Sequence, residues 1–261
     1  MRFPVVLLDM GGTLVGPSVS FGAVYHDVCR RLGLEVDPVQ IERRIWEVWG
    51  EMDRAIPPGR DRYSHFAGGE DEYWMRFAKR VLEQASGVAL KDGFALRAME
   101  QIRDAFMTPT AWQVFPDVRP ALERMVDDGV RMAVVSNWDS RLPQVLEMLD
   151  LASYFEEVAV SHLEGVEKPD PLIFHRVLER MGIEPESAVH VGDVPELDLD
   201  GARAAGIECV LIDRKGKIDA TLNPVDDLSE LPRIASGEVE WPSRGTASSS
   251  APSSSRNPGP S

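Results

Sequence analysis

The stretch "VVLLDMGGTLV", residues 5–15, decides the fold of this chain. Its first four residues, Val5 to Leu8, are all apolar, and such a run predicts a strand that is buried on both faces, as in parallel sheets. Asp9 stands where this strand ends, and the Gly-Gly-Thr sequence at positions 11–13 predicts a tight exit from it. The sequence therefore places a carboxylate at the carboxyl end of a core strand.

The chain from Val118 onward alternates between helical and extended segments. Helices are expected at RPALERMVDDG, RLPQVLEMLD, PLIFHRVLERMG and DLDGARAAG, and strands at VRMAVVSN, EEVAVS, SAVHVGD and ECVLID. Strands that alternate with helices of this length are typical of βαβ units. The predicted fold class is therefore α/β, with a doubly wound parallel sheet.

The apolar residues of residues 17–106 recur at three-and-four spacing, which favours helices instead. We therefore predict a Rossmann-like core made of residues 1–16 and 107–235, with an inserted helical cap of residues 17–106. Residues 236–261 are rich in Ser, Pro and Gly and are expected to be disordered. A set of three tryptophans is expected in the core of the cap: Trp46, Trp49 and Trp74.

The charge balance limits the classes of partner. The 261 residues contain 28 Lys and Arg against 43 Asp and Glu, a net charge of −15, which disfavours nucleic acid and anionic membranes as partners. Cys29 and Cys209 lie far apart without CxxC spacing, so we expect neither a disulfide framework nor a zinc site, as in a cytoplasmic protein. The first apolar run is short and ends at Asp9, which is unlike a signal peptide or a membrane anchor.

Candidate site residues follow from the fold class, because ligands of doubly wound sheets bind beyond the carboxyl ends of the strands. The polar residues expected there are Asp9, Thr13, Ser136, Asn137, Lys168 and Asp193, with Glu196, Asp198 and Asp200 behind Asp193. Carboxylate oxygens suit Mg²⁺, which completes its shell with water and substrate phosphate. A hydroxyl, backbone N–H groups and a lysine suit an anion that gains charge in a transition state. The set indicates a metal-assisted phosphoryl site with a carboxylate nucleophile.

Each of these residues alone has a simpler interpretation. Asp9 suits a solvated turn, Ser136 suits turn chemistry after a strand, and Lys168 suits an exposed loop. Asp198 suits a helix N-terminus, and His190 in a core strand is expected to be a packed histidine rather than a base. The order of these residues along the chain, each at a strand end or beside one, is what argues for a site.

The motifs DxxGT, SN after a strand, KPDP and HVGDxxxxDxxGAxxAG resemble those of the haloacid dehalogenase superfamily of hydrolases, most of which are phosphatases. The resemblance covers roughly Phe3 to Asp213, and the helical insertion resembles the branch with a mobile helical cap. It implies that Asp9 is a nucleophile that becomes an aspartyl-phosphate. It also implies roles for the other residues: Mg²⁺ held by Asp9, the Gly11 carbonyl and Asp193; the transferring group bound by Thr13, Ser136 and Asn137 and neutralised by Lys168; and the metal and the lysine supported from behind by Asp198.

Gly11 departs from the pattern of this superfamily. Its phosphatases usually carry a second Asp at this position, which protonates the leaving oxygen, whereas its dehalogenases carry an aromatic residue and use no metal. General acid–base catalysis contributes roughly 10²–10⁴-fold, so substrates with acidic leaving groups are expected to suffer least from the glycine. Cap-loop residues that would replace the missing acid are Asp61, Tyr63, His65 and Glu70. Arg60 and Arg62 of the same loop fit either a grip on an anionic substrate or a solvated loop.

The sequence therefore predicts a cytoplasmic, Mg²⁺-dependent phosphatase that acts on a small phosphorylated metabolite through Asp9. Two alternatives stay open: a non-catalytic binding protein, of which Gly11 would be the signature, and a dehalogenase-like hydrolase. Asp193 and Asp198 argue against the dehalogenase, because a metal-free site has little use for both.

Overall fold

A five-stranded sheet forms the centre of the molecule, with the strand order β5-β4-β1-β6-β7. The computed structural model describes residues 1–57 and 59–239. The strands are β1 (Val5–Leu8), β4 (Arg131–Ser136), β5 (Glu157–Val160), β6 (Ala188–Gly192) and β7 (Glu208–Leu211), and all neighbours are parallel. Every residue of β1 is fully buried, as the apolar run predicted. The predicted fold class is confirmed.

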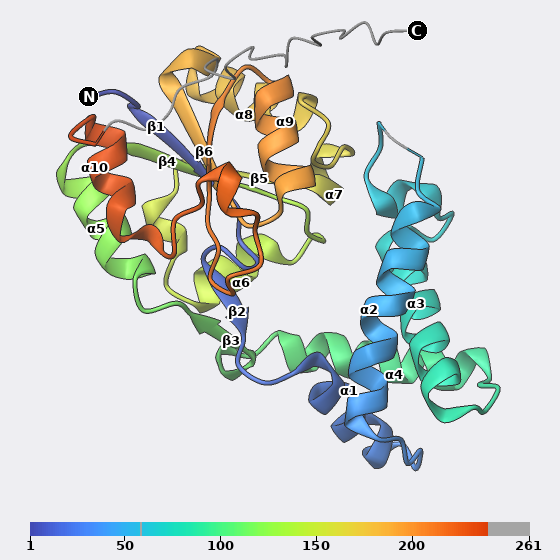
Figure 1. The fold of residues 1–261 in the computed structure, drawn as a ribbon. Coiled ribbons are helices and arrows are strands. Elements are labelled where there is room, and N and C mark those ends of the chain that lie inside the picture. The colour runs from blue at the N-terminus through green and yellow to red at the C-terminus, as the bar shows by residue number, and fades with distance from the viewer. Residues whose placement is uncertain (58, 240–261) are drawn as a thin grey trace, which may run out of the picture.

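Helices cover both faces of this sheet (Figure 1). The core elements are α5 (Val118–Asp127), α6 (Leu142–Met148), α7 (Ser161–Glu164), α8 (Leu172–Met181), α9 (Asp200–Ala204) and α10 (Leu231–Ser236). Residues of α5, α6 and α10 pack with Val6 and Leu8 on one face, while residues of α8 and α9 pack with Val5 and Leu7 on the other. The alternation of side chains along β1 thus supplies both apolar layers.

The strand order reverses beside β1. From β1 the chain moves outward through β4 and β5, and then returns to the opposite side of β1 as β6 and β7. The carboxyl ends of β1 and β6 therefore flank the point at which ligands bind in open α/β sheets.

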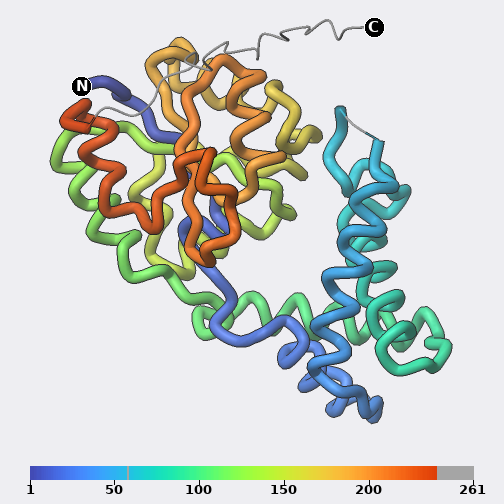
Figure 2. The backbone as a smooth tube through the Cα atoms, in the orientation of Figure 1, coloured from blue at the N-terminus to red at the C-terminus, as the bar shows by residue number. Residues whose placement is uncertain are grey.

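The insertion has an apolar core of its own. It contains α1 (Phe21–Arg31), α2 (Pro38–Arg54), α3 (Gly69–Ser86) and α4 (Asp92–Phe106), whose buried residues form one separate cluster. An antiparallel ribbon of β2 (Val15–Pro17) and β3 (Trp112–Val114) carries the chain between this unit and the sheet, as Figure 2 shows. In residues 1–57 and 59–239, no helix is both long and apolar enough to cross a membrane.

Two segments differ from the sequence-based expectation. DLDGARAAG is not one helix, because a π-helical turn at Pro195–Leu199 precedes α9. The start of the segment expected to be disordered is ordered: Ser236 ends α10, and Val239 packs against the apolar cluster of the core. The rest of that segment, residues 240–261, lies outside the described residues.

Gly22 and Gly50 form a matched pair for testing the helical packing. A Cβ at Gly22 in α1 would lie 2.2 Å from the Pro38 carbonyl oxygen of α2, whereas one at Gly50 would meet only the flexible end of Arg54, at 3.4 Å. We expect Gly22→Ala to lower the free energy of unfolding by roughly 1–3 kcal/mol, because the two backbones must separate. Gly50→Ala should raise it by up to about 1 kcal/mol, since alanine favours a helix interior. Urea unfolding of both variants measures this, and equal signs would refute the close packing of α1 on α2.

Candidate active site

Asp9 and Ser136 meet at the carboxyl ends of two adjacent strands. The Asp9 main chain still pairs with β6, because its N–H donates to the Val191 carbonyl at 2.9 Å. Ser136 is the last residue of β4, and its hydroxyl donates to Asp9 Oδ1 at 2.9 Å. The strand ends thus fix the orientation of the Asp9 carboxylate.

Lys168 brings a buried ammonium between two carboxylates. Its Nζ donates to Asp9 Oδ1 at 2.7 Å and to Asp198 Oδ1 at 2.6 Å, and the residue is 2% exposed. Asn137 holds the main chain of the lysine, since its Nδ2 donates to the Lys168 carbonyl at 2.9 Å and its Oδ1 accepts from the Lys168 N–H at 2.8 Å. In the structure, the Asn137 side chain therefore contacts the main chain of Lys168 and positions this residue.

Asp198 is fixed from every side. Besides Lys168, its Oδ1 lies 2.9 Å from His190 Nε2, and its Oδ2 accepts from the Val194 N–H at 2.9 Å. His190 is fully buried, as expected for a packed histidine, and its Nδ1 lies 3.1 Å from the Leu7 carbonyl oxygen. It does more than fill the core, because it positions Asp198 behind Lys168.

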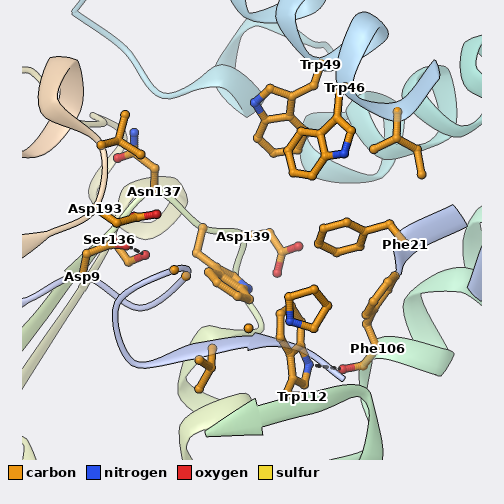
Figure 3. A pocket seen from close by; sticks show the side chains of 18 of the residues that line it. Asp9, Phe21, Trp46, Trp49, Phe106, Trp112, Ser136, Asn137, Asp139 and Asp193 are labelled. Atoms are coloured by element: carbon orange, nitrogen blue, oxygen red, sulfur yellow. Dashed lines mark hydrogen bonds between the residues drawn. The ribbon is translucent and has the colours of Figure 1, made fainter. Parts of the chain in front are cut away.

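Asp193 stands at the end of β6 over the turn that follows Asp9. Gly12 has a φ of +80°, and a Cβ there would lie 2.0 Å from Asp193 Oδ2. Only glycine allows both this backbone angle and this close approach. Figure 3 shows the Asp193 side chain beside those of Asp9, Ser136 and Asn137.

The electrostatics of these groups are coupled. Burial lowers the pKa of Lys168, but the charges of Asp198 and Asp9 outweigh this and raise it above its ordinary value. Burial raises the pKa of Asp198, but Lys168 and His190 outweigh this and hold it below its ordinary value. The pKa of Asp193 rises to about 7, because burial and the charges of Asp9 and Asp198 disfavour its ionised form. The Lys168 ammonium thus lies in contact with two carboxylates, Asp9 and Asp198, and its charge also lowers the pKa of a third, Asp193.

The residues present fit Mg²⁺. Among the described residues, no group of three His, Cys, Asp or Glu side chains has a metal-binding arrangement. A metal at this site would therefore have two carboxylate ligands, Asp9 and Asp193, and would complete its shell with the Gly11 carbonyl, water and substrate. Within the described part of the chain, no hydrogen bond reaches the Asp193 carboxylate, so both of its oxygens are available to a ligand. An all-oxygen, negatively charged donor set suits a hard cation that keeps several waters. The oxygens of Asp198 are occupied, which suits its expected place behind the metal.

Thr13 is fully buried, and its hydroxyl has no hydrogen-bond partner within the described residues. Its carbonyl accepts from Arg214 Nη2 at 2.8 Å, which holds the turn in place. A buried hydroxyl without a partner is costly, so it suits a group that gains its partner when a ligand binds.

An aromatic ring occupies the space beside Gly11. A Cβ on Gly11 would lie 3.3 Å from Cζ3 of the Trp138 indole, which is tight. Trp138 directly follows the Ser136-Asn137 motif, and its main-chain N–H donates to Ser161 Oγ at 3.1 Å. The sequence motifs did not indicate a role for Trp138, because adjacency to a motif does not show in which direction a side chain points.

The cap-loop candidates for the missing acid separate clearly. Tyr63 lines the cavity that contains Asp9, whereas Asp61, His65 and Glu70 are not among its lining residues. Asp61 is buried and accepts from the Tyr63 N–H at 3.0 Å, and Glu70 accepts from the Ser140 N–H at 3.0 Å. Burial raises the pKa of Tyr63 well above its ordinary value, so its hydroxyl stays protonated at neutral pH.

Arg62 is not a solvated loop residue. It is 5% exposed, and its Nε donates to Glu167 Oε2 at 3.0 Å. Glu167 is the residue directly before Lys168 in the sequence. Arg62 therefore ties the cap loop to the loop of the core that carries Lys168. Arg60 is exposed.

Two of the three cap tryptophans are where they were expected. Trp49 and Trp74 pack against the apolar cluster of the insertion. Trp46 is 57% exposed and lines the cavity, so its expected place in the cap core is wrong. Helical spacing identified the apolar face of α2, but it did not show which part of the molecule that face contacts.

Residues 3–206 match the family of haloacid dehalogenase-like hydrolases. The chain belongs to this family. It is a hydrolase, and the motif resemblance is confirmed.

Named relatives include a phosphatase. The haloacid dehalogenase-like hydrolase domain-containing protein 3 of Danio rerio is 32% identical over 242 residues, covering 89% of this chain and 97% of the relative. A phosphoserine phosphatase of Thermus thermophilus is 28% identical, with coverage of 80% and 88%. The crystal structure of a HAD phosphatase from Thermococcus onnurineus has a TM-score of 0.60 at 26% identity, and the match covers 91% of this chain and 99% of that one.

Replacing Lys168 by methionine tests the shared ammonium. We expect Lys168→Met to lower the free energy of unfolding by roughly 3–5 kcal/mol, because two buried carboxylates lose their cation. Burial already raises the pKa of Asp9 in the wild type, and Lys168 lowers the pKa of both Asp9 and Asp198. Without Lys168, both pKa values in the folded variant should lie further above those in the unfolded chain, so the folded variant binds more protons and loses stability as pH rises.

The loss in the free energy of unfolding of Lys168→Met, relative to wild type, should therefore be larger at about pH 8 than at about pH 5. Urea unfolding in EDTA measures it, with Lys91→Met at an exposed position as the control. A deficit that is equal at both pH values would contradict the assigned pairing.

Proposed function

We propose that this hydrolase is a Mg²⁺-dependent phosphatase of a small phosphorylated metabolite and acts through an aspartyl-phosphate on Asp9. The observation that carries the proposal is the state of the Asp9 carboxylate. Ser136 and Lys168 hold its Oδ1, its Oδ2 accepts no hydrogen bond from the described residues, and Asp193 stands beside it. The phosphoserine phosphatase relative and the HAD phosphatase structure support the same chemistry.

The residues divide the work of phosphoryl transfer. Asp9 Oδ2 is the nucleophilic oxygen, while Ser136 and Lys168 hold the carboxylate in place and lower its pKa against the effect of burial. The Lys168 ammonium, which lines the cavity, and the Thr13 hydroxyl would stabilise a group that gains negative charge. Mg²⁺, held by Asp9, Asp193 and the Gly11 carbonyl, would neutralise phosphate oxygens. Asn137 and Asp198 keep Lys168 in place.

A dehalogenase-like reaction is the second candidate, and one observation favours it. The Trp138 ring beside Gly11 supplies an aromatic group close to the place where dehalogenases of this superfamily are expected to carry one. The Asp193 carboxylate, which accepts no hydrogen bond from residues 1–57 and 59–239, favours the phosphatase, because a metal-free site would not need it. Halide release from a 2-haloacid in EDTA distinguishes the two reactions.

Asp9→Asn should abolish phosphate release, because an amide cannot serve as the nucleophile. Asp193→Asn should weaken Mg²⁺ binding and lower activity at limiting metal. Asp200→Asn, at an exposed acid of the same segment, is the matched control and should keep wild-type activity. Phosphate release from acetyl phosphate, with Mg²⁺ and with EDTA, measures all three variants. Retained activity in folded Asp9→Asn would exclude the covalent mechanism.

The glycine at position 11 predicts a dependence on the leaving group. Wild-type enzyme should hydrolyse acyl and aryl phosphates faster than alkyl phosphates, because no acid at this position protonates the leaving oxygen. Gly11→Asp should raise alkyl phosphate turnover only modestly, since Trp138 must move to make room. Gly11→Asp/Trp138→Ala should raise it by roughly tenfold or more.

Trp138→Ala alone is the control, and it should leave alkyl phosphate turnover low. A leaving-group series on the wild type and the three variants measures the effect. Equal rates for aryl and alkyl phosphates in the wild type would show that another group, with Tyr63 the first to test, already donates the proton.

A further inference from the structure

The cavity that contains Asp9 extends far into the insertion. Its volume is about 930 Å³, and it reaches from Asp9 and Asp193 to residues of α1, α2, α3 and α4. A volume near the upper end of small-molecule pockets is far more than a phosphate group needs. Figure 3 shows the carboxylates at one end and the rings of Phe21, Trp46 and Trp112 at the other.

Five rings form a continuous series along this cavity: Trp46, Phe21, Phe106, Trp112 and Trp138, called the ring series below. Successive ring centroids lie 5.8, 5.5, 5.6 and 5.2 Å apart. The series begins on α2 of the insertion and ends beside Gly11, next to the nucleophile. It therefore leads from the cap to the reacting atoms.

The outer end of the ring series is open. Trp46 is 57% exposed, although its only polar group is satisfied, because Nε1 donates to Glu42 Oε1 at 2.9 Å. What remains uncovered is the apolar face of an indole. Such a face in a cavity is a favourable contact for another flat apolar group.

The charged residues at this end of the cavity pair with other protein groups: Glu42, Asp53, Arg62, Arg103, Asp139 and Arg141. Arg62 pairs with Glu167 and Asp53, and Arg141 Nε donates to Asp139 Oδ1 at 2.9 Å.

Arg103 pairs with Glu70, and Glu42 accepts from the Gly22 N–H. Within the described residues, each of these charged side chains therefore has at least one partner, and two buried polar atoms of the wall, Arg62 Nη1 and Trp74 Nε1, have none. A leaving group with an ammonium and a carboxylate, or with many hydroxyls, would find few free partners here. Lys215 and Lys217 also line the cavity, and Lys215 lies near Asp193 at the phosphate end.

The geometry points to a phosphomonoester whose leaving group carries a flat aromatic ring, laid against the ring series with its phosphate at Asp9. This inference rests on the proposed phosphatase function and names its substrate class. The missing acid at position 11 agrees with it, because an aryl oxygen, with a pKa of about 10 as in tyrosine, leaves without prior protonation more readily than an alkyl oxygen.

The reaction balances without a further reactant. The bond between Asp9 Oδ2 and phosphorus forms as the bond from phosphorus to the aryl oxygen breaks, and the electron pair stays on that oxygen. The aryl oxide takes a proton from solvent after it leaves. Water then cleaves the aspartyl-phosphate, which restores the carboxylate and gives inorganic phosphate and a proton.

Binding of two phosphonates, which cannot be hydrolysed, tests the ring site without catalysis. In Mg²⁺, wild-type protein should bind phenylphosphonate roughly tenfold more tightly than methylphosphonate. Trp138→Ala should narrow this ratio to roughly threefold or less, because a phenyl ring bonded to phosphorus at Asp9 lies at the end of the ring series beside Gly11. Val39→Ala, at an exposed apolar residue of α2 that does not line the cavity, should keep the wild-type ratio. Calorimetry measures the dissociation constants, and equal affinities in the wild type would overturn the inference.

Kinetics then separate the two proposals. Trp138→Ala should lower kcat/KM for 1-naphthyl phosphate several-fold more than for acetyl phosphate, which has a good leaving group but no ring, and the loss should appear in KM. Asp9-dependent turnover of acetyl phosphate without any ring preference would overturn the ring inference alone. A preference for phenylphosphonate with no turnover of either phosphate would support the ring site and reject the proposed phosphatase function.

Discussion

One buried ammonium determines the geometry of this site. Lys168 Nζ contacts both Asp9 and Asp198, and thereby joins the end of β1, the loop before α8 and the turn after β6. Burial alone favours the neutral forms of both carboxylates, and Lys168 lowers the pKa of each against this effect. The neighbours of Lys168 serve the same end: Asn137 holds its main chain, and His190 holds Asp198 from the other side.

Glycines make this concentration of charge possible. The strand order reverses between β1 and β6, so the turns after these strands approach each other closely. A Cβ at Gly192 would lie 2.1 Å from the Asp198 carboxyl carbon, and one at Gly12 would overlap the Asp193 carboxylate. These glycines are needed because only a residue without a Cβ allows the backbone to approach a carboxylate so closely. Glycine loses more conformational entropy on folding than other residues, so this geometry has a cost in stability.

The insertion adds what the sheet cannot supply. It gives the cavity a wall of rings with few free charges, and it is tied to the core through Arg62 and Glu70. A ring from the core, Trp138, occupies the space beside Gly11 where an acidic side chain would stand. Both features favour the same leaving group, one that binds by apolar contact and departs without a proton. The cavity and the chemistry therefore agree.

The sequence by itself determined the α/β class, the order of the elements and the polar residues at the strand ends, because buried strands, tight turns and helix periodicity are local patterns. It placed Asp9, Ser136, Lys168, Asp193 and Asp198 in one neighbourhood, since parallel strands end at a common edge. Only the tertiary structure decided that Asn137 holds Lys168, that Trp138 lies beside Gly11, that Arg62 is buried and that Trp46 faces the cavity. Each of these contacts joins segments far apart in the chain, or depends on how a side chain is turned. Periodicity shows which face of a helix is apolar, but the partner of that face is set by the packing of the whole molecule.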